Sequence, residues 1–185
     1  MKIRTRFAPS PTGNVHIGNI RVAIYNWLFA KHNNGNFLLR IEDTDRERST
    51  DDAIQNLLTT LKWLNLDYDE VPLYQSKQEK KHLEVAEYLL SKGKAYKENK
   101  NNKGECIIFK MPNNDMIFED GIKGSLKKAV ENIEDFVLVR SNGKPVFHLA
   151  NVVDDIEQKV THVIRGDDHI ENTYKHLALY QALNA

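Results

Sequence analysis

The chain has 185 residues, of which 41% are hydrophobic and 28% charged, a balance that is ordinary for a soluble globular protein. Lysine and arginine total 26, as do aspartate and glutamate, so net charge gives no reason to expect nucleic-acid binding. The single cysteine, Cys106, excludes an intrachain disulfide and a zinc site built from several cysteines. Without a signal-like start or an apolar run of roughly 20 residues, we expect a cytoplasmic protein.

The first 42 residues predict a βαβ unit with a parallel sheet. "KIRTRFA" is strand-like, and "GNFLLRIEDTD" is a short apolar strand that ends in acids. The helix expected between them, in "NIRVAIYNWLFAKHN", has apolar residues at helical spacing: Ile20, Ala23, Ile24, Trp27 and Leu28.

Two more helices are expected in the first half of the chain. Thr50 is a suitable cap for one with an apolar face from Ile54 to Leu64, and the other runs from about 77 to 91 and stops at Gly93. Trp27 and Trp63 fall on helical apolar faces, which favours core positions for both.

The polar stretch "KENKNNKGE", residues 97–105, opens a segment of different composition. It predicts strands in "CIIFKM" and "DFVLVRS" and a helix in "GSLKKAVENIEDF". "PVFHLANVVDD" and "KVTHVIRGDDH" are typical of buried strands, and "IENTYKHLALYQAL" of a helix. We therefore expect an α/β protein in three parts: half a nucleotide-binding fold at 1–96, an α+β insertion at 97–144, and the start of a second half at 145–185.

The loop in "RFAPSPTGNVHIGN", residues 6–19, has the features of a phosphate site. Two prolines stiffen it, and the helix that follows presents unpaired backbone N–H groups and the positive end of its dipole. Gly18 lets a ligand approach the bare backbone, and His16 can donate a hydrogen bond to phosphate. The alternative is a rigid turn with an incidental histidine, which a lone H-x-G does not exclude.

Five blocks extend this pattern over the chain from residue 3 to the end. They are "RFAPSPTGNVHIGNIRVAIYNWLFA", "LLRIEDTDRERST", "LKWLNLDYDE", "PVFHLANVVDD" and "THVIRGDDHIENTYKHLALYQAL". In this order they resemble the catalytic domain of glutamyl-tRNA synthetases, which are class I aminoacyl-tRNA synthetases. The resemblance implies a Rossmann-type fold and two reactions: ATP-dependent activation of glutamate to glutamyl-adenylate with release of pyrophosphate, then transfer to the 3′ end of tRNA(Glu).

"HIGN" is this family's form of the class I ATP signature, so the resemblance implies that His16 and Gly18 are catalytic. The ATP contacts that it implies are Ser10, Thr12, His16, Gly18, Asn19, Asp168 and His169, with Mg²⁺ accompanying the nucleotide. Backbone amides, a histidine and Mg²⁺ suit phosphoryl-type chemistry, which depends on positioning and charge stabilisation.

The same resemblance implies a glutamate pocket formed by Arg6, Ser10, Glu42, Phe147, Asn151 and Arg165. Arg6 and Arg165 match the carboxylate-binding arginines, whose planar forks bind carboxylate bidentately. Ser10 and Glu42 match the residues that hold the amino group. For either arginine the alternative is a surface ion pair, and for Glu42 it is a salt bridge with Arg40 or Arg46.

Asp43, Thr44, Asp45 and Arg46 correspond to a loop that borders the tRNA acceptor end in the family. They follow the second strand, and ligands of parallel sheets bind at the carboxyl ends of strands. Alone, this run could be a solvated charge cluster or a metal site. Asp154 and Asp155 look catalytic, but the family places them behind the pocket, so we expect structural roles for both.

Three departures from the family pattern stand out. Phe147 occupies a position where the family usually has tyrosine. The insertion is much shorter than usual and cannot hold the zinc-binding cysteines of bacterial members, so no zinc is expected. The family's second signature, which contains a lysine, normally lies beyond Ala185. We therefore expect an amino-terminal part of a synthetase, weakly active alone or completed by a separate carboxyl-terminal part.

Three other functions remain open. A truncated paralogue glutamylates a queuosine base of tRNA(Asp) and shares the pocket and the first signature. A non-catalytic relic could bind glutamate, ATP or tRNA. A small nucleotidylyltransferase would explain the histidine–glycine loop but not "VVDD" or "VIRGDDH".

Overall fold

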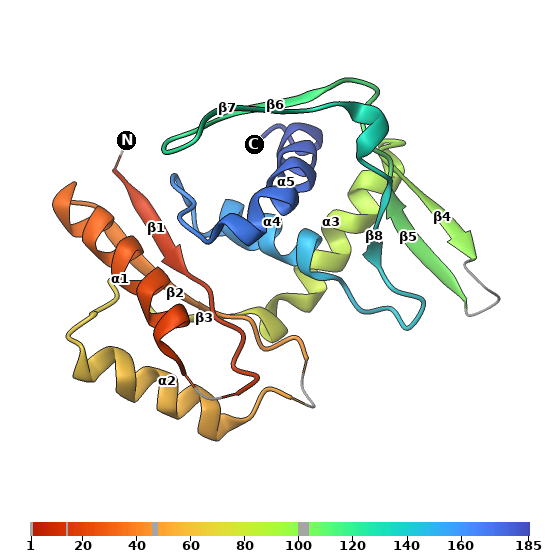
Figure 1. Cartoon of the computed structure of the whole chain (residues 1–185). Helices are drawn as coiled ribbons and strands as arrows, with labels where there is room; N and C mark the ends of the chain where they lie inside the picture. Colours follow the sequence, from red (N-terminus) through yellow and green to blue (C-terminus); the bar gives the residue numbers. More distant parts are fainter. Residues whose placement is uncertain (1, 14, 46–47, 100–103) are drawn as a thin grey trace. The chain divides into compact units, whose positions relative to one another are not determined.

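The computed structural model describes residues 2–13, 15–45, 48–99 and 104–185. The chain divides into two compact units, each considered by itself. Unit 1 comprises Met1–Gln78 with Glu157–Gly166, and unit 2 comprises Glu79–Ile156 with Asp167–Ala185. Helices and strands mix in both, and unit 1 contains a parallel sheet, as the α/β prediction required (Figure 1).

The sheet of unit 1 has the order β1-β2-β3 and is parallel throughout (Figure 1). Its strands are β1 (Arg4–Phe7), β2 (Asn36–Ile41) and β3 (Leu73–Tyr74), and α1 (Ile17–His32) connects the first two. The predicted βαβ unit is therefore confirmed. Because the strands are parallel, their carboxyl ends meet at one edge, where the loops after β1 and β2 begin.

One apolar cluster joins both helices of unit 1 to its sheet. The second helix, α2 (Asp51–Trp63), starts as predicted at Thr50, whose hydroxyl accepts a hydrogen bond from Ala53 N at 3.2 Å. The buried members of the cluster are Phe7, Ile20, Ala23, Ala30, Phe37, Leu39, Ile41, Ile54, Leu57, Leu61 and Leu66.

Unit 2 combines an antiparallel sheet with three helices and a separate ribbon. The sheet has the order β4-β5-β8, with β4 (Ala95–Asn99), β5 (Glu105–Phe109) and β8 (Phe136–Val139). The helices are α3 (Glu79–Ser91), α4 (Phe147–Glu157) and α5 (Ile170–Ala182). The ribbon β6 (Met116–Asp120) and β7 (Gly124–Lys128) lies beside α5, where the rings of Phe118 and Tyr174 meet edge to face (Figure 1).

Short turns of 3-10 helix connect several of these elements. They cover Gln75–Gln78, Val130–Asn132 and Asp167–His169. The first of them leads directly into α3, so the helix predicted at 77–91 is confirmed with a tighter first turn. Gly93, the predicted stop, has φ 65°, a left-handed conformation that glycine adopts without strain.

Three of the predicted helices and strands are wrong, and so is the predicted core position of one tryptophan. "PVFHLANVVDD" is not a strand but contains α4, in which every residue from Leu149 to Asp155 is buried. A helix that is buried on all sides has no polar face, so its sequence lacks the alternation that indicates a helix. The predicted helix in "GSLKKAVENIEDF" is replaced by β7 and a 3-10 turn, because β7 pairs with β6. Residues 160–166, all described, form neither helix nor strand, and Trp63 is 78% exposed.

Candidate active site

The loop between β1 and α1 forms a pocket of about 210 Å³ within unit 1. The proline-rich stretch lies over α2, and a hydrogen bond from Thr12 N to Ser10 O (2.9 Å) closes a turn inside it. The residues that line the pocket are Pro9, Ser10, Pro11, Thr12, Gly13, Val15, His16, Asn19, Ala53 and Leu57. Of the five predicted ATP and glutamate residues that follow β1 or begin α1, four therefore line one cavity: Ser10, Thr12, His16 and Asn19.

His16 caps the amino terminus of α1. Its ring Nδ1 accepts a hydrogen bond from Gly18 N at 3.1 Å, while its own backbone N donates to Asn19 Oδ1 at 3.3 Å. Because Nδ1 accepts an N–H donor, a neutral His16 ring must have its proton on Nε2. The side chain is exposed, so Nε2–H can donate to an anion at a helix terminus whose dipole favours negative charge.

Gly18 makes room for this ring. A Cβ at position 18 would lie 2.9 Å from His16 Cε1 and 3.0 Å from His16 Nδ1, closer than van der Waals contact permits. The sequence suggested that Gly18 leaves space for a ligand. In the structure the histidine ring occupies that space. Packing within the protein is therefore enough to explain the H-x-G spacing.

Glu42 lies at the carboxyl end of β2 and is linked to the same loop. Its backbone N donates to Pro9 O at 3.0 Å, which joins the start of the proline-rich loop to the end of β2. The fully buried guanidinium of Arg40 lies 3.6 Å from Glu42 Oε1 and donates to Gln158 Oε1 at 3.2 Å. The salt bridge with Arg40, one of the alternatives for Glu42, is thus present.

The acidic loop after β2 is held by short polar contacts. Asp43 accepts hydrogen bonds from Ser76 N at 2.8 Å and from Ser76 Oγ at 2.6 Å. Asp45 Oδ2 lies 2.6 Å from Arg48 Nε, and Thr44 is exposed. Arg46, the fourth residue predicted here, lies outside the described residues. Asp43 and Asp45 therefore fix the conformation of the loop.

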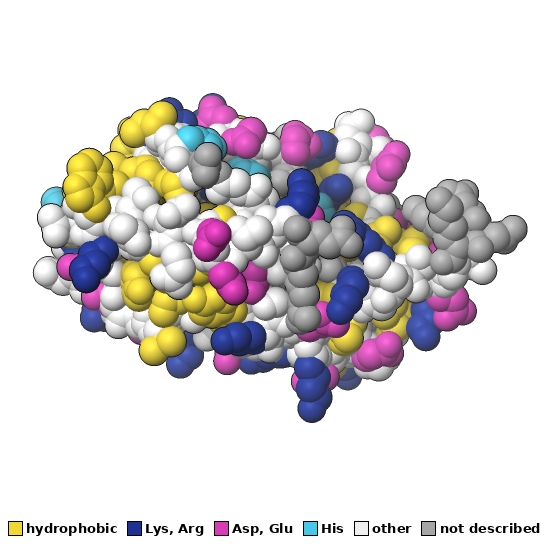
Figure 2. Space-filling view, turned by 90° about the horizontal axis from the view of Figure 1, so that it is seen from below, with side chains coloured by type: hydrophobic (Ala, Val, Ile, Leu, Met, Phe, Trp, Pro, Cys, Tyr) yellow, Lys and Arg dark blue, Asp and Glu magenta, His cyan; other side chains and the backbone are white. Residues whose placement is uncertain are grey.

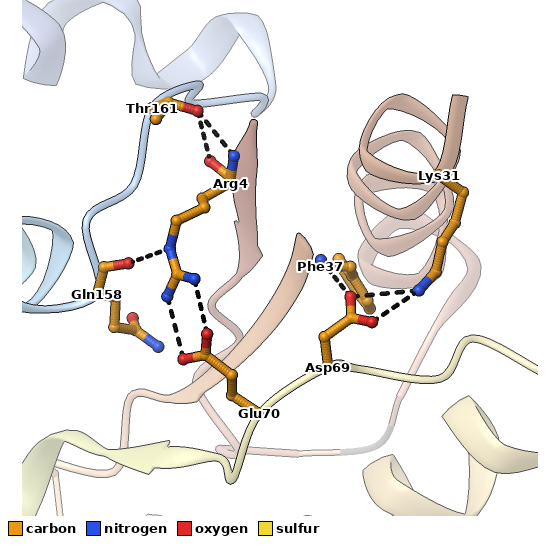
Figure 3. Close-up of polar contacts among 7 residues, drawn as sticks. All are labelled: Arg4, Lys31, Phe37, Asp69, Glu70, Gln158 and Thr161. Carbon is orange, nitrogen blue, oxygen red and sulfur yellow. Dashed lines mark hydrogen bonds and ion pairs between the residues drawn. The ribbon is translucent and has the colours of Figure 1, made fainter. Parts of the chain in front are cut away.

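The segment 157–166 brings Arg165 into unit 1, the unit that also contains the buried Arg6 of β1. Figure 3 shows how Arg4 fastens this segment: Arg4 Nε donates to Gln158 O at 2.7 Å, and Arg4 N donates to Thr161 Oγ1 at 2.8 Å. The Arg4 guanidinium also binds both oxygens of Glu70, at 2.6 and 3.0 Å.

Two carboxyl groups drawn in Figure 3, those of Glu70 and Asp69, have lowered pKa values. The hydrogen bonds from Arg4 lower the pKa of Glu70, since they stabilise the ionised form. Partial burial opposes ionisation of Asp69, but hydrogen bonds from Phe37 N (2.7 Å) and Lys31 Nζ (3.0 Å) outweigh it, so the pKa of Asp69 is also lowered.

The other four predicted site residues belong to unit 2. Phe147, the first residue of α4, is 38% exposed, and Asn151 is buried one turn later on the same helix. Asp168 is exposed, and His169 Nδ1 lies 3.1 Å from Asn172 Nδ2. The Phe147 ring lies 6.5 Å, centroid to centroid, from the ring of His169.

Asp154 and Asp155 have the structural contacts that we expected of them. Asp154 Oδ1 lies 2.7 Å from Nε2 of His82, and both side chains are buried. Asp155 accepts a hydrogen bond from the Tyr180 hydroxyl at 3.1 Å. Both carboxylates thereby connect α4 to neighbouring helices of unit 2.

Within the described residues, no group of three or more histidine, cysteine, aspartate or glutamate side chains is arranged to hold a metal ion. None of the described helices combines the length and apolar character needed to span a bilayer. On the face seen in Figure 2, basic and acidic side chains are interspersed.

Sequence reasoning missed the residues that support the site. No role was assigned to Arg4 or to Asn26 from the sequence alone. Asn26 is in fact fully buried and donates to the backbone of residue 164. An asparagine among the apolar positions of a helix was the available signal, since buried polar groups are normally hydrogen-bonded.

A parallel βαβ unit whose helix begins under a stiff loop is typical of α/β proteins that bind ligands at the carboxyl ends of their strands. Comparison with known families identifies which class of α/β protein this is. The family described as tRNA synthetases class I (E and Q), catalytic domain, matches residues 2–104 and 97–185. The chain belongs to this family.

Individual relatives agree with this assignment. The chain is 42% identical to a glutamate–tRNA ligase of Legionella pneumophila (strain Lens), in an alignment covering 100% of the chain and 46% of that protein. It is 43% identical to a glutamate–tRNA ligase of Thermodesulfovibrio yellowstonii, covering 98% of the chain and 46% of the relative.

Solved structures agree as well. A crystal structure of a glutamate tRNA ligase from Elizabethkingia meningosepticum, in complex with its amino acid, superposes with a TM-score of 0.91. The sequence identity is 31%, and the match covers 100% of this chain and 47% of that one. The chain thus spans about half the length of the relatives that it matches.

Proposed function

We propose that the chain is the part of a glutamate–tRNA ligase that activates L-glutamate with ATP and transfers it to the 3′ end of tRNA(Glu). Family membership and the relatives named glutamate–tRNA ligase support this function. The observation that carries it is the pocket beside His16, with Glu42 hydrogen-bonded through its backbone to the same loop.

ATP is assigned to the loop and the start of α1. The exposed Nε2 of His16 and the positive end of the helix dipole suit phosphate oxygens, and Ser10, Thr12 and Asn19 line the same pocket. Gly18 contributes to the site because it has no Cβ, so the His16 ring can lie over the start of the helix. Asp168 and His169 are assigned to the nucleoside, and Mg²⁺ accompanies the phosphates.

Glutamate is assigned to side chains that suit its two carboxylates and its ammonium group. Arg6 and Arg165 supply planar guanidinium donors for the carboxylates. Glu42, oriented by the buried Arg40, supplies the negative charge that an ammonium group needs, beside Ser10. Asn151 and Phe147 of unit 2 are also assigned to glutamate.

The tRNA acceptor end is assigned to the loop after β2 and to the insertion. Asp43 and Asp45, which contact Ser76 and Arg48, are assigned to it together with Thr44 and Arg46. The insertion is assigned to residues 97–144, between the parts at 1–96 and 145–185. The two stretches that match the family overlap at 97–104, which supports a shortened insertion starting there.

The direct test is ATP–pyrophosphate exchange that depends on L-glutamate, with and without tRNA(Glu), alongside calorimetric titration of each ligand. His16→Asn is the informative variant, because asparagine is also a good helix cap but lacks the Nε2 donor. His32→Ala, at the other end of α1, is the matched control. We expect His16→Asn to lower exchange by about 10²–10³-fold, the usual effect of losing one charge-stabilising donor.

The outcomes separate the candidate functions. Exchange that His16→Asn reduces and His32→Ala does not supports the ligase. Binding of glutamate and ATP without any exchange would identify a non-catalytic module. Glutamylation of tRNA(Asp) at its anticodon loop would identify the queuosine-modifying paralogue.

A further inference from the structure

A buried amide connects the middle of α1 to the segment that contains Arg165. The Asn26 side chain is fully buried, and its Nδ2 donates to Val22 O at 2.9 Å and to Ile164 O at 3.0 Å. The first acceptor belongs to the same helix. The second belongs to the residue immediately before Arg165, at a sequence separation of 138 residues.

The segment needs such a support because it has little regular structure of its own. Residues 160–166, all of them described, form neither helix nor strand. Arg4 holds the beginning of the segment through Gln158 O and Thr161 Oγ1 (Figure 3). The bond from Asn26 lies further along, at the residue immediately before Arg165.

Contacts with β1 and α1 hold the segment on the way to Arg165. Thr161 N donates to Arg4 O at 2.9 Å, and Asn26 Nδ2 donates to Ile164 O at 3.0 Å. Asn26 is itself joined to β1, because Thr5 Oγ1 donates to Asn26 O at 2.9 Å. The backbone just before Arg165 is therefore held by α1, which is in turn hydrogen-bonded to β1.

We propose that Asn26 is a positioning residue for Arg165: its buried amide fixes the backbone before Arg165, and glutamate affinity depends on that bond. This inference rests on the proposed function, which assigns Arg165 to a carboxylate of glutamate. Without the amide, Ile164 O loses its donor inside the protein and has to turn toward water, since buried unpaired carbonyls are unfavourable. Arg165 moves with it.

Two substitutions at position 26 test the bond in different ways. Asn26→Leu keeps the volume and removes both hydrogen bonds. Asn26→Ser retains a hydroxyl, which in a helix bonds the carbonyl four residues back, so it preserves the bond to Val22 O and loses the one to Ile164 O. Asn33→Leu is the matched control, because Asn33 Nδ2 donates to Phe29 O (2.7 Å), an acceptor within α1 rather than in the segment before Arg165.

Two measurements are made on each variant: backbone hydrogen exchange of peptides covering 157–166, and calorimetric titration with L-glutamate and with ATP. For both Asn26 variants we expect faster exchange in that segment and about tenfold weaker glutamate binding, the effect of roughly one lost buried hydrogen bond. ATP affinity should stay the same, and Asn33→Leu should change neither affinity.

Each other outcome is decisive. Unchanged hydrogen exchange in both Asn26 variants, or faster exchange with full glutamate affinity, overturns the proposal. Equal weakening of ATP and glutamate binding also overturns it, because the effect would then spread through the whole helix. If the unsubstituted protein does not bind glutamate, the proposed function fails, whereas hydrogen exchange still shows whether Asn26 holds the segment.

Discussion

The ring of His16 occupies the space that a side chain at position 18 would need. The missing Cβ of Gly18 would lie 2.9 Å from Cε1 of His16, and Gly18 N donates to His16 Nδ1 at 3.1 Å. The two residues therefore depend on each other: glycine admits the ring, and the ring caps the helix. This arrangement directs the remaining donor, Nε2–H, away from the protein.

Replacing Gly18 with alanine is expected to displace the His16 ring. The cap would be lost, which costs about 1 kcal/mol of stability, and ATP binding would weaken because Nε2 is no longer oriented. Calorimetry of ATP binding and thermal unfolding measure the two effects. Gly121→Ala is the control, since a Cβ there meets nothing within 4 Å. A Gly18→Ala variant with normal ATP affinity would contradict the role of the ring.

Glu70 should make the stability of the protein sensitive to acid. The hydrogen bonds from Arg4 lower the pKa of Glu70 from its ordinary value of 4.5. A carboxyl group whose pKa is lower in the folded state stabilises the protein at any pH above its pKa in the unfolded state, about 4.5. This stabilisation is lost as the pH falls from about 4.5 through the pKa of the folded state. Because the Glu70 side chain is 48% exposed, solvent screening keeps the effect within about 1 kcal/mol.

The comparison of wild type with Glu70→Gln isolates this contribution. Urea unfolding of both proteins between pH 3 and pH 7 should show a smaller loss of stability toward acid in Glu70→Gln. Parallel curves for the two proteins would mean that the Arg4–Glu70 contact does not stabilise the folded state.

His82 and Asp154 should behave as one structural unit. They form a buried contact of 2.7 Å, and Nδ1 of His82 has no hydrogen-bond partner among the described residues. Removing one member of a buried polar pair leaves the other without its partner, which typically costs about 3–5 kcal/mol when the pair is charged. Asp154→Ala should therefore lower stability strongly.

A double-mutant cycle of His82→Ala and Asp154→Ala tests this dependence. We expect the double variant to be more stable than the sum of the single effects predicts, with a coupling of about 1 kcal/mol or more. Strictly additive losses of unfolding free energy would show that each side chain acts through other contacts.

Local signals made the first half of unit 1 predictable. The spacing of Ile20, Ala23 and Trp27 indicated α1, and Thr50 indicated the start of α2, because these features depend on neighbours in sequence. The loop residues Ser10 and His16 could likewise be grouped, since they lie within seven positions of each other.

Long-range packing explains what was not predictable. In α4, Val152 and Val153 favour a strand by propensity, and only burial of the helix on all sides overrides that preference. The bond from Asn26 to Ile164 joins positions 138 residues apart, so no local pattern contains it. Trp63 was expected on an apolar face, but α2 buries Ile54, Leu57 and Leu61, and Trp63 at its last residue faces solvent.

Phe147→Tyr should strengthen glutamate binding if position 147 belongs to the glutamate pocket. The Phe147 ring is 38% exposed, so a hydroxyl can be added without burying an unpaired polar group. A hydrogen bond to a charged group contributes about 1.5–3 kcal/mol, which corresponds to a gain of roughly ten- to a hundredfold in affinity. Calorimetric titration with L-glutamate measures it, with Phe147→Leu as the control that adds no hydroxyl. If tyrosine and leucine leave the affinity equally unchanged, position 147 does not contact the amino acid.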